Sequence, residues 1–125
     1  MDGDSLYGEV ISRYSRAQAI DDGVLVAVDS KTSREAGIGF PVAMTASVYA
    51  ECVRIPKGSR SGQDEKGRMW DVLMMLRFAI KVQRGACDRI LYRLKVGGRV
   101  RTLKAVCGGG DAGEPVITIM LPEED

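Results

Sequence analysis

The sequence predicts an α+β domain: an antiparallel sheet of about four strands including a C-terminal hairpin, covered by one long helix and shorter N-terminal helices. Three observations lead to this prediction. Residues 68–84 place apolar side chains at helical spacing, residues 89–107 alternate polar and apolar side chains around Gly97-Gly98, and residues 116–121 form another apolar run. Because helices come mainly first and strands mainly last, we expect an antiparallel sheet with helices on one face.

Shorter elements are predicted in the N-terminal part of the chain. Ser15 is placed to cap a short helix that ends at Gly23, and residues 24–28 form an apolar, β-branched run typical of a covered strand. Residues 33–36 predict one helical turn.

The segment from residue 40 to residue 44 is ambiguous. Pro41 keeps the preceding residue extended, which suits either the entry of a strand or a loop. Thr45 then caps a helix whose apolar positions recur at helical spacing until Pro56.

Length and composition describe a single domain over residues 1–125. The chain is 45% hydrophobic and 28% charged, which are ordinary values for a globular protein. Residues 1–8 are interpreted as a tail, and residues 57–67, which are polar and contain three glycines, as a flexible loop.

Several classes of protein are disfavoured by what the sequence lacks. It contains no histidine, which removes Ser-His and Cys-His nucleophile pairs and histidine metal sites. Its net charge is +1, and it has no apolar stretch of about 20 residues and no signal peptide. We therefore expect a cytoplasmic protein without a cofactor, a bound metal or a membrane association.

The three cysteines support the same interpretation. Cys52, Cys87 and Cys107 are odd in number and widely spaced, unlike a disulfide framework or the ligands of a zinc site. We expect all three to be reduced, mostly buried thiols.

The first candidate site is a basic face of the long helix that contains the single tryptophan. Its ring could be covered by its own chain, could anchor a protein partner or a second copy, or could stack on a nucleic-acid base. The candidate partner-binding residues are Trp70, Met74, Arg77, Lys81 and Arg84.

The second candidate site is the C-terminal hairpin, which would bind acidic protein or nucleic acid. Alternating basic residues on such a hairpin are usually the solvated side of the sheet. The candidate nucleic-acid-binding residues are Arg89, Arg93, Lys95, Arg99, Arg101 and Lys104.

Other features suggest chemistry more weakly. The loop 108–113 is rich in glycine, but it leads into a strand rather than into the helix N-terminus that a phosphate loop requires. Asp71 is expected to be partly buried and paired with a strand arginine. An enzyme would have to use Asp71, Asp111 or Cys107.

Several segments resemble an uncharacterised family of small bacterial proteins, a domain of unknown function met on plasmids, integrative elements and phages. The segments are VISRYSRAQA (10–19), REAG (34–37), FPVA (40–43), GRMWDVL (67–73), TLKAVC (102–107) and GDAGEPVITIML (110–121). The resemblance brings no established activity and no functional residue. It implies a genomic setting in which small accessory proteins more often bind and modulate host factors than catalyse.

The function expected from these observations is a non-enzymatic accessory protein that docks on a protein partner or self-associates. A nucleic-acid-binding module that uses the basic hairpin and the helix face is the alternative. A small enzyme of unknown reaction ranks third.

Overall fold

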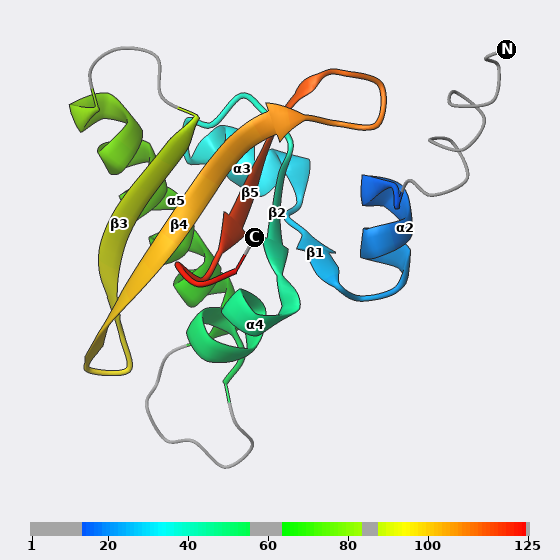
Figure 1. The fold of residues 1–125 in the computed structure, drawn as a ribbon. Coiled ribbons are helices and arrows are strands. Elements are labelled where there is room, and N and C mark those ends of the chain that lie inside the picture. Colours follow the sequence, from blue (N-terminus) through cyan, green and yellow to red (C-terminus); the bar gives the residue numbers. More distant parts are fainter. Residues whose placement is uncertain (1–13, 56–63, 84–87, 125) are drawn as a thin grey trace, which may run out of the picture.

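The computed structural model describes residues 14–55, 64–83 and 88–124. Five strands form one mixed sheet in the order β1-β2-β5-β4-β3 (Figure 1). The strands are Leu25–Ala27 (β1), Val42–Thr45 (β2), Arg89–Val96 (β3), Arg99–Gly109 (β4) and Pro115–Met120 (β5). The helices are Arg16–Asp21 (α2), Ser30–Glu35 (α3), Ala46–Val48 (α4), the π-helical turn Tyr49–Val53 (η1) and Glu65–Val82 (α5).

The α+β class is confirmed, but the sheet has one strand more than expected and is not wholly antiparallel. The additional strand is β2, which follows Pro41 in the ambiguous segment. It pairs in parallel with β5, where Val42 lies opposite Ile117, and antiparallel with β1. Helix α5 and the β3–β4 hairpin separate β2 from β5 in the chain, so the order of elements did not reveal this pair.

The predicted C-terminal hairpin is confirmed. Strands β3 and β4 pair along their length, with Val96 opposite Arg99 at the closed end. Gly97 and Gly98 both have positive φ, 58° and 81°, the backbone conformation that a two-residue hairpin turn demands. This backbone conformation favours glycine at both positions.

The hydrophobic core lies between one face of the sheet, called here the core face, and the helices α3, α4, η1 and α5. Side chains alternate along a strand, so Tyr92 and Leu94 share this face with Leu103 and Ile119. Each large aliphatic side chain buried here stabilises the fold by about 1.5–3 kcal/mol. The fully buried residues that α5 contributes are Val72, Leu73 and Leu76.

The opposite face of the sheet, called here the back face, is only partly covered. Arg16 of α2 reaches across it, and its guanidinium donates to Thr118 Oγ1 at 2.7 Å and to the Ile117 carbonyl at 2.9 Å. The half formed by β3 and β4 remains open, because the side chains of Leu91 and Val100 are 62% and 58% exposed.

A buried lysine attaches the C-terminal turn to the back face. The side chain of Lys104 is 7% exposed, and its ammonium donates to the carbonyls of Pro122 and Glu124. The Glu124 carboxylate in turn accepts from Thr45 Oγ1 at 2.8 Å. Lys104 therefore has a structural role: its ammonium is hydrogen-bonded to the C-terminal turn and holds that turn against the sheet.

The long helix begins earlier than the sequence predicted. Asp64 caps α5 by accepting from the Gly67 amide at 2.6 Å, so residues 64–67 belong to the helix start rather than to the predicted loop 57–67. This cap outweighs the low helix propensity of Gly67. The rest of that loop and the tail 1–8 lie outside the described residues.

We predict that Tyr92 makes stability fall in alkaline solution. Burial raises the pKa of Tyr92, and its hydroxyl donates to the Val72 carbonyl at 3.3 Å. Above about pH 10 an unfolded tyrosine loses a proton that folded Tyr92 keeps, so rising pH favours the unfolded state. Tyr92→Phe should cost about 1 kcal/mol at neutral pH and flatten the alkaline decline.

Chemical denaturation of both proteins between about pH 8 and pH 11 measures this effect. Equal alkaline slopes for the wild type and the phenylalanine variant would contradict it.

Candidate partner-binding surface

Helix α5 is held at its start and along its buried side. At its start, Glu65 accepts from the hydroxyl of Tyr49 at 2.8 Å, which ties α5 to η1, and Arg68 donates to the Arg54 carbonyl at 3.1 Å. Along the helix, Leu73 and Leu76 are fully buried against the core. A helix held this firmly presents its remaining side chains in fixed positions.

The structure separates the residues of the predicted helix site. Trp70 and Lys81 reach the surface, and the tryptophan side chain is 37% exposed. Met74 is partly buried against the core, while the side chain of Arg77 crosses Gly37 and fills the space that a β-carbon there would occupy. Arg84 lies outside the described residues.

The most exposed apolar side chains of α5 are ones that the sequence analysis passed over. Phe78 and Val82 are 62% and 64% exposed, well above Ile80 at 39% and Met75 at 37%. We define the outer face of α5 by the residues Asp71, Met74, Met75, Phe78, Lys81 and Val82. A surface helix normally carries polar residues opposite its buried side. Apolar residues on both sides of α5 were therefore the sequence feature that could have indicated this exposed patch.

Asp71 does not occupy the environment that was expected for it. It was predicted to be partly buried and paired with a strand arginine, whereas its side chain is exposed on the outer face of α5. The strands pack against the other side of the helix, where Val72 and Leu76 are buried. Asp71 is therefore available to groups outside the domain.

The six basic residues of the hairpin are divided between the two faces of the sheet. The pairing register puts Arg89, Arg93 and Lys95 on the back face and Arg99 on the core side. Arg101 also points to the core side, where it pairs with Glu51 at 3.3 Å. With Lys104 buried, the hairpin does not present all six charges to one ligand.

The glycine-rich loop is occupied by contacts within the domain. The Asp111 carboxylate accepts from the backbone amides of Arg16 and Ala17 at 2.7 and 3.0 Å, and so caps α2. Glu114 accepts from the Ala112 amide at 3.0 Å and closes the loop. Burial lowers the pKa of Arg16, and the Asp111 and Glu114 carboxylates oppose that shift. The loop therefore docks α2 onto the sheet.

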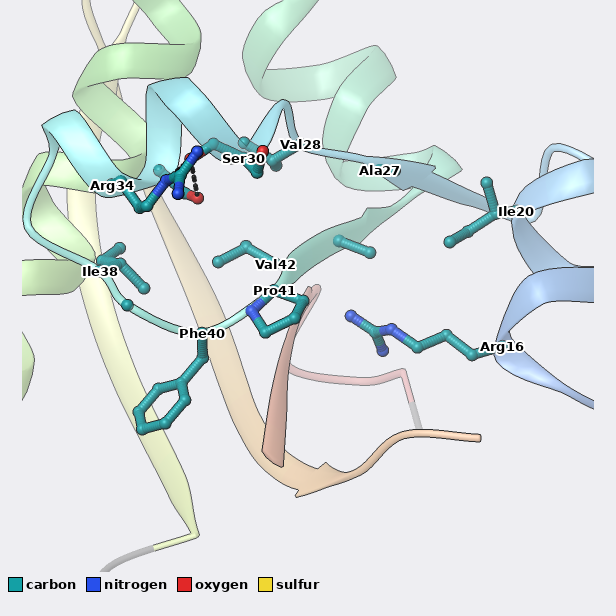
Figure 2. Close-up of a pocket in the computed structure, with 13 residues that line it drawn as sticks. Arg16, Ile20, Ala27, Val28, Ser30, Arg34, Ile38, Phe40, Pro41 and Val42 are labelled. Carbon is teal, nitrogen blue, oxygen red and sulfur yellow. Dashed lines mark hydrogen bonds between the residues drawn. The ribbon is translucent and has the colours of Figure 1, made fainter. Parts of the chain in front are cut away.

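A hollow of about 290 Å³ lies between α2, α3 and β2, with an arginine near each end (Figure 2). Arg16 points into it beside Pro41, but its guanidinium is already bonded to β5. Arg34 donates to the Ser30 carbonyl at 3.3 Å. The lining residues that the structure describes include no carboxylate and no thiol, so this hollow offers no acid–base pair.

The cysteines are the remaining candidates for chemistry. Cys52 is buried on η1 and Cys107 is exposed on β4, and both are free thiols, while Cys87 lies outside the described residues. The expectation of mostly buried thiols is therefore wrong for Cys107. Within residues 14–55, 64–83 and 88–124, no group of three or more acidic residues or cysteines could hold a metal ion.

Comparison with known proteins places the chain in a family. Residues 5–125 match a family model described as a family of unknown function, DUF6573. The chain belongs to this family. No curated protein and no solved structure matches the chain. None of the helices in the described part of this family member is long and apolar enough to cross a bilayer.

We predict that Asp111→Ala will loosen α2. The substitution leaves two amides at the start of the helix without their acceptor and should lower the free energy of unfolding by about 1–2 kcal/mol. Hydrogen exchange at Arg16 and Ala17 should accelerate more than the global loss explains. Asp71→Ala, on the exposed outer face, should stay within about 0.5 kcal/mol of the wild type. Equal exchange rates in the two variants would contradict the capping role.

We predict unequal reactivity for the two described cysteines. Burial raises the pKa of Cys52, which disfavours its reactive thiolate, whereas Cys107 is exposed. In a Cys87→Ser background, a thiol reagent should modify Cys107 rapidly and Cys52 only after denaturant is added. Rapid modification of Cys52 in the folded protein would show that η1 opens.

Proposed function

We propose that this chain is a non-enzymatic binding protein that docks on a protein partner through the outer face of α5. The observation that carries the proposal is the exposure of Phe78 and Val82, together with Met75, along the C-terminal half of α5. Apolar patches ringed by polar side chains mark protein interaction sites on soluble domains. Trp70 borders the patch, and tryptophan is enriched among the residues that dominate binding energy.

The biological setting is part of the same proposal. The resemblance to small proteins of plasmids, integrative elements and phages supports an accessory factor of a bacterial mobile element that acts in the cytoplasm. Both cysteines in the described part of the chain, Cys52 and Cys107, are free, which is compatible with a reducing compartment.

The nucleic-acid alternative has less support. Of the six hairpin cations, Arg89, Arg93 and Lys95 are exposed on the back face, where the apolar side chain of Leu91 is exposed as well. Nucleic-acid sites combine several cations along one surface, often with aromatic stacking platforms. The division of the charges between two faces works against such a site.

We predict that Phe78→Glu will abolish partner binding and leave the fold intact. A charge at the centre of the outer face cannot be buried against an apolar partner, whereas a side chain already 62% exposed contributes little to the core. Tagged variants should be compared for capture of an untagged copy of the chain and of proteins from host extract, and for their thermal midpoints. The midpoint should shift by no more than about 2 °C.

The matched control is Leu91→Glu, because that side chain is also 62% exposed but lies on the back face of the sheet. It should capture the same partner as the wild type. Identical captured proteins for Phe78→Glu and the wild type would rule out the outer face of α5 as the docking surface.

A further inference from the structure

The outer face of α5 has a symmetric arrangement about the position of Leu76. Met74 and Phe78 lie two residues to either side of it, and both are apolar. Asp71 and Lys81 lie five residues to either side and carry opposite charges. The same symmetry continues to Trp70 and Val82, six residues to either side.

These positions have the spacing of contact positions in paired helices. Asp71, Met74, Phe78 and Lys81 are separated by three, four and three residues, as are the contact positions of paired helices. They therefore form a narrow seam that is apolar at its centre and charged at its two ends. Within the described chain, neither Asp71 nor Lys81 forms an ion pair, and both side chains are exposed.

We propose that this seam binds the same seam of a second copy of the chain, with the two α5 helices antiparallel about a twofold axis that crosses the outer face at the level of Leu76 along the helix. The inference rests on the proposed function and names the partner of that surface. Phe78 then packs on Met74 of the second copy. Asp71 pairs with Lys81 of the second copy, and the twofold axis repeats each contact.

Charge decides the direction of this pairing. In a parallel pair, Asp71 would face Asp71 and Lys81 would face Lys81, and both contacts would be repulsive. In the antiparallel pair, both end contacts are attractive. A twofold interface requires a self-complementary surface, which the arrangement about Leu76 supplies, whereas a different protein as partner would need no such symmetry.

The size of the contact predicts a weak dimer. A seam confined to one pair of helices belongs to the small class of interfaces, below about 1,200 Å². We therefore expect a dissociation constant in the micromolar range, and dissociation on dilution. Sedimentation of the purified chain over a range of concentrations measures this equilibrium.

Charge exchange tests the register. Asp71→Lys and Lys81→Asp should each turn two attractive contacts into two repulsive ones and raise the dissociation constant about tenfold. An equal mixture of the two variants should associate as a heterodimer with near wild-type affinity. A single chain carrying both exchanges should also dimerise like the wild type, because each end again joins opposite charges.

Phe78→Ala should raise the dissociation constant about 30-fold, as truncation of a central interface side chain does. Leu91→Ala, on the back face of the sheet, should leave it unchanged. A chain that stays monomeric at every concentration overturns the inference, as does a dimer that is indifferent to Phe78→Ala or not restored by the double exchange. A monomer that still captures a host protein through Phe78 would overturn the second copy as partner and leave the proposed function standing.

Discussion

The position of β5 between β2 and β4 is the constraint on which the rest of this fold depends. The Ile117 amide donates to the Pro41 carbonyl at 2.9 Å, and the same strand pairs along its other edge with β4. Its side chains are buried on both faces of the sheet, including Ile119 on the core face and Val116 on the back face. The last strand of the chain thereby joins the N-terminal elements to the C-terminal hairpin.

This central position explains why several charged residues serve the architecture. Arg16 bonds to β5, Lys104 holds the turn that follows β5, and Asp111 caps the helix that carries Arg16. From the sequence, Lys104 had been a candidate for binding nucleic acid and Asp111 a candidate for catalysis. The hydrogen bonds of these three residues hold α2 and the C-terminal turn against the back face of the sheet. That face is only partly covered, so these polar contacts keep the two segments in place.

Helix α5 uses one side for stability and the other side for the proposed binding function. Val72 and Leu76 are buried against the sheet, whereas Phe78 and Val82 project from the opposite side. Substitutions on the outer face can therefore change association while the core stays intact. Because the helix is tied to η1 through Glu65, its outer side chains are held in place before a partner arrives, which lowers the entropic cost of binding.

Local patterns in the sequence by themselves determined the class of the fold, the existence of α5, the glycine turn of the hairpin and the short helix behind Ser15. These features depend on interactions within a few residues, such as caps, turn geometry and side-chain period. Tertiary structure alone decided the parallel pairing of β2 with β5, because hydrogen bonds between strands far apart in the chain leave no local pattern. Tertiary structure also decided the candidate site. Trp70 was chosen from the sequence because tryptophan is rare and often lies at interfaces. Whether an apolar residue of α5 faces the core or solvent, however, depends on where the sheet and η1 pack. Phe78 is exposed, and Met74 partly buried, for that reason.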